Sequence, residues 1–283
     1  MITSMSNQRV RQIAQWQSKA KQRRQDGVFL AEGWKMYGEA PLELIREVYL
    51  SESMAEQLKS RKTAEGAEGD RALYRTPYID YIEEKLSRTG YETVSEEVFG
   101  RMSDTQTPQG ILTVLRRPAY GMGDLLRGED PLLLLLEDIQ DPGNLGTILR
   151  TGEGAGITGV IMSSRTVDIY NPKTIRATMG SIYRVPFLYA EDLGETVRAL
   201  QKNGIRVYAA HLQGETYYSS LSFREGTAFL IGNEGNGLRR ETAALADSYL
   251  KIPMEGQVES LNAAIAASLL VYEAHRQRHL QAP

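Results

Sequence analysis

The run of leucines from Leu132 to Leu136 constrains the fold more than any other stretch of this 283-residue chain. A strand with one face in water alternates apolar and polar side chains, so an all-leucine strand must be buried on both faces, as in the middle of a parallel sheet. Strands and helices alternate along the chain after this run, which predicts a parallel sheet covered by helices. The predicted fold class is therefore α/β.

The chain is long enough for two domains, and its 41% hydrophobic residues can supply two cores. Residues 1–117 show a shorter alternation of strands and helices, which predicts a small α/β domain. Residues 118–131 are rich in glycine and proline, a composition typical of a linker. We therefore predict a small domain over 1–117, a linker over 118–131 and a parallel-sheet domain over 132–283.

Composition excludes several classes of protein. No apolar run approaches the roughly 20 residues of a membrane-spanning helix, and the polar N-terminus lacks the apolar core of a signal peptide, so we expect a cytoplasmic protein. The chain has no cysteine, which excludes disulfides, thiolate nucleophiles and thiolate metal sites. His275 and His279 have helical i, i+4 spacing but no evident third ligand, and we expect no metal.

The charge of the chain is unevenly distributed. The formal net charge of -3 argues against a globally basic nucleic-acid-binding protein, yet residues 1–25 contain six basic residues and no acid. This segment is either a solvated helix face or a surface that binds nucleic-acid phosphates. Its basic residues are Arg9, Arg11, Lys19, Lys21, Arg23 and Arg24.

Three loops of the second predicted domain, 137–150, 232–238 and 254–262, contain the candidate functional residues. The last two each follow a short apolar strand and lead into a helix. In a parallel sheet, ligands bind where strands end and helix N-termini present unpaired backbone donors. These two loops are therefore expected to share one ligand pocket.

The side chains of these loops allow more than one interpretation. Asn144 and Arg150 are six residues apart and so face different sides of a helix; they indicate either a capped helix with a surface arginine or a site for a phosphate or carboxylate. The glycines of 232–237 permit close backbone approach to a ligand, but the run matches neither the dinucleotide fingerprint nor the phosphate loop. Glu234 suits a ligand with a positive centre or with hydroxyls.

The last helix is expected to begin near Ser260, which could simply cap it. Leu261, Ile265, Leu269 and Tyr272 recur at helical spacing, and we interpret them as an inward-facing stripe. The remaining faces carry small side chains, against which we expect a second subunit to pack. These small residues are Ala263, Ala264, Ala266 and Ala267.

The residues of the three loops also resemble a known family. DPGNLGTILRT (141–151), LIGNEGNGL (230–238) and IPMEGQVESLNAA (252–264) are similar, in order and spacing, to the three motifs of the SpoU, or TrmH-like, branch of the SPOUT superfamily of RNA ribose 2'-O-methyltransferases. RATMGSIYRVPF (176–187) also resembles the family. Upstream, FLAEG and SDTQTPQGILTVL resemble the N-terminal RNA substrate-binding domain of many members, so almost the whole chain is covered.

This resemblance implies a catalytic domain with a deep trefoil knot that binds S-adenosylmethionine and acts as a homodimer. It also implies site residues, which are carried over here by motif position. The backbone around Ile231, Gly232, Ile252, Leu261 and Asn262 is expected to hold the cofactor. The polar positions expected to be catalytic are Asn144, Arg150, Glu234, Ser260 and Asn262.

The predicted function is methyl transfer from S-adenosylmethionine to a ribose 2'-hydroxyl of RNA, with 23S ribosomal RNA as the expected target. The alternatives are a transfer-RNA ribose methyltransferase and a catalytically silent, knotted RNA-binding or assembly factor. Because a guanidinium is effectively always protonated, we hypothesise that Arg150 binds an RNA phosphate and stabilises the developing alkoxide rather than acting as the base. The basic N-terminal residues are expected to bind RNA.

Overall fold

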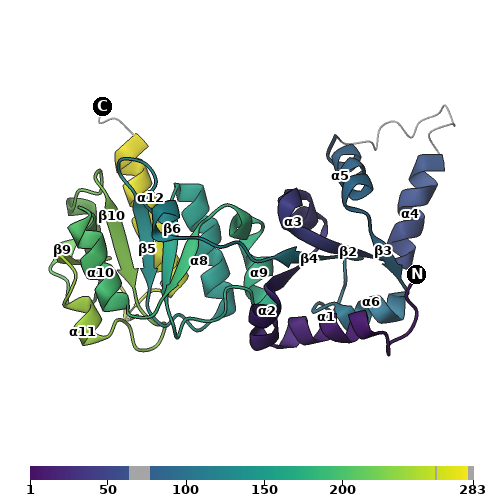
Figure 1. Ribbon diagram of the computed structural model, residues 1–283. Helices are drawn as coiled ribbons and strands as arrows, with labels where there is room; N and C mark the ends of the chain where they lie inside the picture. Colours follow the sequence, from purple (N-terminus) through teal and green to yellow (C-terminus); the bar gives the residue numbers. More distant parts are fainter. Residues whose placement is uncertain (64–76, 259, 280–283) are drawn as a thin grey trace. The chain divides into compact units, whose positions relative to one another are not determined.

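The computed structural model describes residues 1–63, 77–258 and 260–279. It divides the chain into two compact units, whose elements are labelled in Figure 1. Unit one comprises Met1–Pro118 and Tyr170–Gly180, and unit two comprises Ala119–Ile169 and Ser181–Pro283. The boundary after Pro118 lies one residue beyond the predicted end of the first domain. The segment Tyr170–Gly180, which the sequence placed in the second domain, packs with unit one instead.

Unit one is built on a mixed sheet. Among the described residues its strands are ordered β1-β4-β2-β3, with β4 antiparallel to both of its neighbours and β3 parallel to β2. The strands are β1 (Val28–Glu32), β2 (Ile45–Ser51), β3 (Glu92–Val94) and β4 (Ile111–Arg116). The helices are α1 (Gln8–Ser18), α2 (Ala20–Asp26), α3 (Trp34–Glu39), α4 (Glu52–Thr63), α5 (Pro77–Thr89) and α6 (Glu96–Met102).

The N-terminal helix α1 is part of the core of unit one. Val10, Ile13 and Trp16 are fully buried and pack with residues of β1, β4 and α6. The indole of Trp16 donates to Asp26 Oδ2 at 2.6 Å, which satisfies its one polar group. The apolar residues of the basic segment therefore belong to a helix that packs into the core of this unit.

The segment Tyr170–Gly180 contains helix α9 (Pro172–Thr178), which contacts β1. The buried ring of Tyr170 lies 4.8 Å from the ring of Phe29, and the Arg117 guanidinium lies 4.4 Å from the centre of the Tyr170 ring. These contacts explain why the segment belongs to unit one although it lies between elements of unit two along the chain.

Unit two contains a parallel sheet. Its described strands are ordered β7-β6-β5-β10-β8-β11-β9, and every neighbouring pair is parallel. The leucines of β5 are at most 1% exposed and lie between β6 and β10, which confirms the central parallel strand predicted from them. The strands are β5 (Leu132–Leu136), β6 (Gly159–Ser163), β7 (Phe187–Ala190), β8 (Arg206–Ala210), β9 (Thr216–Tyr217), β10 (Thr227–Ile231) and β11 (Ser248–Lys251).

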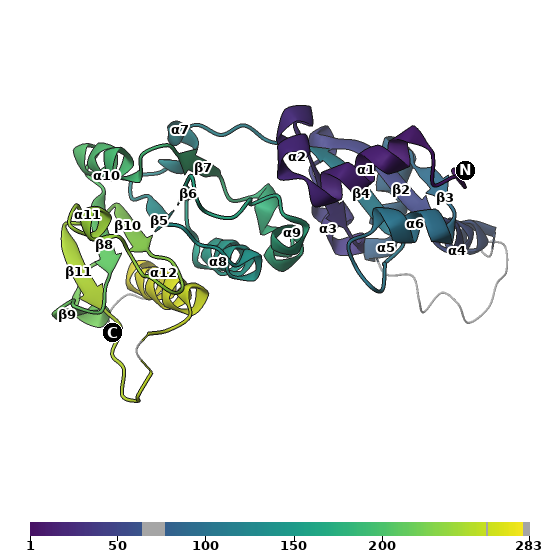
Figure 2. The ribbon, with the colours of Figure 1, turned by 90° about the horizontal axis from the view of Figure 1, so that it is seen from below.

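Helices cover both faces of this sheet. Side chains from α7 (Met122–Leu125), α10 (Leu193–Lys202) and α11 (Arg240–Ala243) pack into one core with β5, β8 and β10. Figures 1 and 2 show α8 (Pro142–Ala155) and α12 (Ala263–His279) on the opposite face. Leu125 of α7 is fully buried, so the expected linker 118–131 contributes to the core of unit two.

The orientation predicted for the last helix is wrong. Ile265, Leu269 and Tyr272 are 50%, 37% and 47% exposed, and Leu261 at the start of this series is only partly buried. The face that packs against α8 and β10 carries Ala263, Ala264, Ala267, Leu270, Val271 and Ala274. Small side chains let α12 approach its own domain closely, and this leaves the larger apolar side chains of the stripe on the surface.

Candidate functional site

A cavity of about 780 Å³ lies at the carboxyl ends of β8, β10 and β11 in unit two. Of the predicted cofactor residues, Ile231, Gly232, Ile252 and Leu261 line it, and Ser260 also reaches it. Asn262 lies between Leu261 and Ala263, which are both lining residues. The two strand exits therefore share one pocket, as the sequence predicted.

The glycine-rich loop that follows β10 is held in a tight turn. The amides of Asn233 and Gly237 each donate to the other residue's carbonyl, at 3.1 and 2.9 Å. A side chain on Gly232 would place its Cβ 2.3 Å from both the Gly237 carbonyl carbon and the Leu238 amide nitrogen. Gly232 is thus required because backbone passes directly over it, and this close approach shapes the wall of the cavity.

Glu234 connects this loop to the start of α8. Its carboxylate accepts hydrogen bonds from the backbone amides of Gln140 and Asp141, at 3.1 and 3.2 Å, and from the Asn144 side-chain amide at 3.0 Å. Burial alone would raise the pKa of Glu234, but the hydrogen bonds from Asn144, Gln140 and Asp141 outweigh it and hold the pKa below its ordinary value. The group is therefore a carboxylate at neutral pH.

Asn144 extends this connection to α12. Its side-chain oxygen accepts a hydrogen bond from the Asn262 side-chain amide at 3.0 Å, while its own amide donates to Glu234. Asn262 also accepts from the backbone amides of Ala264 and Ile265, so it caps α12. Of the two roles open to Ser260, the capping role does not apply, because the helix begins at Ala263 and its first free amides donate to Asn262.

These contacts join one polar residue from each of the three loops, in the order Glu234, Asn144 and Asn262. The chain of hydrogen bonds runs beside the cavity, since Glu234 itself lines it. Three motifs that are far apart in sequence therefore form one connected polar site.

Arg150 is placed differently. Helix α8 begins at Pro142, so Asn144 and Arg150 lie on one helix, and the loop predicted over 137–150 ends at Asp141. The Arg150 side chain is exposed and makes no hydrogen bond or ion pair with any residue that the structure describes. It remains available for a ligand that approaches from outside.

The sequence did not predict one wall of the cavity. His211, Leu212, Gln213 and Tyr217 line it from the segment after β8, and Lys251 lines it from β11. The Lys251 ammonium lies 4.9 Å from the centre of the Tyr217 ring. Strand β9 holds only Thr216 and Tyr217, which is too short for a periodic pattern to reveal.

The basic residues of the N-terminal segment are not equivalent. Arg23 is buried, and its guanidinium donates to the carbonyls of Trp16 and Gln17, so it stabilises the corner between α1 and α2. Arg9 forms an ion pair with Glu47 at 3.2 Å. The exposed members of the set are Arg11, Lys19, Lys21 and Arg24.

Neither a candidate metal site nor a membrane-spanning helix is present among the described residues 1–63, 77–258 and 260–279. No group of three or more histidine, aspartate or glutamate side chains there is arranged to hold a metal ion. Within the same residues, every helix is too short or too polar to cross a membrane. The rings of His275 and His279 stack with their centres 4.2 Å apart.

Comparison with known proteins places this site in a family. The model of the SpoU rRNA methylase family matches residues 131–272, half of the chain, which include all three motif loops. The chain belongs to the SpoU rRNA methylase family. In this SpoU methylase, residues 7–113 also match the MRM3-like substrate-binding domain.

Curated relatives of this SpoU methylase include two bacterial enzymes. It is 36% identical over 179 residues, 63% of its length and 70% of the relative's, to the 23S rRNA (guanosine(2553)-2'-O)-methyltransferase RlmP of Bacillus subtilis. A TrmH family tRNA/rRNA methyltransferase of Staphylococcus aureus is 40% identical over 147 residues, which are 52% of this chain and 59% of the relative.

Solved structures match the SpoU methylase over nearly its whole length. An S-adenosylmethionine-bound rRNA methyltransferase from Sinorhizobium meliloti superposes with a TM-score of 0.79 at 28% identity, covering 99% of this chain and 98% of that one. AviRb from Streptomyces viridochromogenes, in complex with the same cofactor, gives 0.78 at 26% identity, covering 98% and 100%. The predicted family, α/β fold class, RNA methyltransferase activity and cofactor are confirmed.

Proposed function

We propose that this enzyme methylates a ribose 2'-hydroxyl in large ribosomal RNA. The observation that carries the proposal is the hydrogen-bonded chain from Glu234 through Asn144 to Asn262 at the cofactor cavity. The Bacillus relative supports the choice of 23S rRNA, because it is named a 23S rRNA 2'-O-methyltransferase and is 36% identical to this chain over 179 residues. The intact polar chain also argues against a catalytically silent factor.

The cavity fits the cofactor in size and lining. Its volume of about 780 Å³ lies within the range of roughly 300–1,000 Å³ usual for small-molecule sites. Ile231, Ile252 and Leu261 provide apolar surface for the adenosyl group, and the backbone that passes over Gly232 shapes the wall beside them. The bound cofactor supplies an electrophilic methyl group on a positively charged sulfur.

The residues of the chain then have to align the ribose and assist loss of its proton. We assign to Asn144 and Asn262 the positioning of the loops, and to Glu234 a negative charge beside the cofactor. Arg150 binds an RNA phosphate and stabilises the developing alkoxide. Ser260 lines the cavity and is assigned a contact with the reacting ribose.

A pH-rate profile of Arg150→Lys tests the role of the arginine. Lysine keeps the positive charge but loses the bidentate geometry of the guanidinium, so positioning predicts a rate lowered at every pH with the shape of the profile unchanged. A shift of the basic limb of the profile would instead identify Arg150 as the base.

We further propose that the enzyme is a homodimer with a trefoil knot in residues 132–283, and that it acts in the cytoplasm. The exposed apolar stripe of Ile265, Leu269 and Tyr272 supports the dimer, because contiguous apolar surface of this kind marks interfaces. We therefore place the dimer interface on this stripe and not on the alanine face of α12, where the sequence predicted it. The knot is proposed because the chain belongs to the SpoU rRNA methylase family.

For unit one we propose RNA binding by the exposed residues Arg11, Lys19, Lys21 and Arg24, with a smaller contribution from the paired Arg9. The match to the substrate-binding domain supports this role. Arg23 is left out because its guanidinium is buried. We retain 1–117 as the substrate-binding domain and 118–131 as the connection to the catalytic domain.

Methyl transfer from labelled S-adenosylmethionine to total RNA of a strain that lacks the gene tests the target. Label is expected in 23S rRNA, and nuclease mapping then gives the nucleotide. Label in transfer RNA would support the alternative substrate. Absence of label from every RNA, with RNA binding retained, would support a silent binding factor and contradict the proposal.

A further inference from the structure

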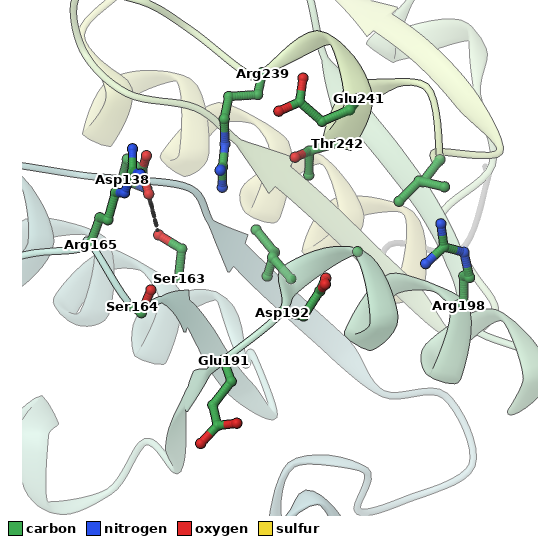
Figure 3. Close-up of a pocket in the computed structure, with 13 residues that line it drawn as sticks. Asp138, Ser163, Ser164, Arg165, Glu191, Asp192, Arg198, Arg239, Glu241 and Thr242 are labelled. Atoms are coloured by element: carbon green, nitrogen blue, oxygen red, sulfur yellow. Dashed lines mark hydrogen bonds between the residues drawn. The ribbon is translucent and has the colours of Figure 1, made fainter.

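A second cavity, of about 440 Å³, lies at the carboxyl ends of β5, β6 and β7 in unit two (Figure 3). It therefore occupies the same edge of the sheet as the cofactor cavity but involves other strands. Its walls come from the residues that follow these strands and from the first turns of α10 and α11. Ligands of parallel sheets bind at this edge, so its position suits a second ligand.

Charged side chains of both signs line this cavity. Arg165, Arg198 and Arg239 are the arginines, and the acids are Asp138, Glu191, Asp192 and Glu241. Two of the acids are already engaged, since Asp138 accepts from the Ser163 hydroxyl at 2.6 Å and Asp192 caps α10 by accepting from the Glu195 amide at 2.9 Å.

Hydrogen bonds to Glu137 fix the position of Arg239. The buried carboxylate of Glu137 accepts from the Arg239 amide at 2.7 Å and from its Nε at 2.8 Å. The Arg239 side chain is still 44% exposed, and Figure 3 shows it extending into the cavity beside Glu241. A guanidinium positioned in this way loses little conformational entropy when it binds a ligand.

Two further side chains, Glu241 and Arg198, make no hydrogen bond or ion pair to another side chain among the residues that the structure describes. A free phosphate or a metal ion would meet like charges in such a cavity. The lining instead suits a neutral ligand that presents hydrogen-bond acceptors to an arginine and donors to a carboxylate.

Guanine has this arrangement of groups. Its O6 and N7 accept a bidentate pair from arginine, and its N1–H and N2–H groups offer two parallel donors to a carboxylate. Adenine, cytosine and uracil do not present both an adjacent pair of acceptors and an adjacent pair of N–H donors. We propose that this cavity binds a guanine base of the RNA substrate, with Arg239 on its O6/N7 edge and Glu241 on its N1/N2 edge. The identification of the ligand as RNA rests on the proposed function.

Binding of mononucleotides to the full-length protein tests the proposal. Titrations with GMP, IMP, AMP, CMP and UMP are followed by NMR in saturating S-adenosylhomocysteine, which keeps the nucleotides out of the cofactor cavity. GMP is expected to bind at least about fivefold more tightly than IMP, which lacks the 2-amino group, and than the other three. Glu241→Gln is expected to abolish the difference between GMP and IMP.

Arg240→Ala is the matched control, because Arg240 is exposed, lies next to Arg239 and does not line the cavity. It is expected to bind GMP as the wild type does. Equal affinity of the wild type for all five nucleotides, or no GMP binding at about 10 mM, would overturn the proposal. The two proposals are distinguished because a wild-type enzyme that binds GMP but transfers no methyl group to RNA would contradict the proposed function and not the guanine site.

Discussion

Replacement of Gly232 by alanine tests whether the close backbone crossing forms the cofactor site. The added Cβ would lie 2.3 Å from two backbone atoms and 2.6 Å from the Gly237 oxygen. Ordinary contact begins at 3.4 Å, so the crossing strand of backbone has to move by about 1 Å. Backbone atoms cannot rotate away as a flexible side chain does, and the loop must therefore open.

The size of the effect follows from what the loop loses. Opening it breaks the two hydrogen bonds between Asn233 and Gly237, worth about 1 kcal/mol each, and adds an overpacking cost of about 1–2 kcal/mol. If this loop is formed in the bound state, the affinity for the cofactor should fall by the equivalent of about 3–4 kcal/mol, roughly 140- to 700-fold. The central strands remain intact, and the protein should stay folded.

Calorimetric titration with S-adenosylmethionine and with S-adenosylhomocysteine measures this change. Gly235→Ala is the control, because its Cβ would meet only the Asn233 side-chain oxygen, at an ordinary 3.6 Å. Circular dichroism checks that both variants are folded. Dissociation constants for Gly232→Ala within about threefold of the control, well below one power of ten, would refute the assignment of this crossing to the cofactor site.

Three further changes test other parts of the site. Glu234→Gln should lower the melting temperature at pH 7. The pKa of Glu234 is lowered in the folded state, so the carboxylate stabilises the fold above the unfolded pKa of about 4.3, and this stabilisation is lost as the pH falls through the folded-state pKa. Thermal melts of the variant and the wild type should therefore converge near pH 3. Leu269→Asp should convert a dimer to a monomer in sedimentation, and a monomeric wild type would contradict the proposed interface. Reversal of charge at Lys21 and Arg24 should weaken RNA binding. It should also reduce the slope of log binding constant against log salt concentration by about one unit per lost phosphate contact. An unchanged slope would show that this surface does not bind the RNA backbone.

Charge reversal is a better test of the basic surface than deletion of residues 1–25, because the deletion changes the core of unit one. Deleting residues 1–25 would also remove Val10, Ile13 and Trp16 from the core of unit one. The resulting loss of RNA binding would follow from unfolding whether or not the basic residues touch RNA.

The sequence predicted the elements with strong internal signals. The leucines of β5 have no solvent-compatible face, and the glycines after β10 permit few alternatives, so the central strand and the shared pocket were recognised. The motifs also singled out Asn144, Glu234 and Asn262 as candidates, but they did not predict the hydrogen bonds that join them. Hydrogen bonds between side chains 90 or more residues apart depend on the fold and leave no local pattern.

The errors have a common physical cause. In α12 both faces are apolar, and hydrophobicity alone assigned the larger side chains to the interior. The interior face was decided by how closely α12 had to approach α8, where a Cβ on Gly154 would already lie 2.9 Å from the Tyr272 hydroxyl oxygen. The wall around Tyr217 likewise depends on tertiary contacts, whereas the cap at Asn262 is made by local hydrogen bonds from the amides of Ala264 and Ile265.

Because Tyr170–Gly180 belongs to unit one, a single cut in the sequence cannot separate the two units. A fragment that stops after Pro118 would lack α9, and the ring of Phe29 would lose its partner Tyr170. The rest of the chain, expressed alone, would carry Tyr170 without the surface it packs on. Neither half is a self-sufficient module, so transplanting the substrate-binding unit onto another methyltransferase requires two joined segments, with the second inserted between β6 and β7.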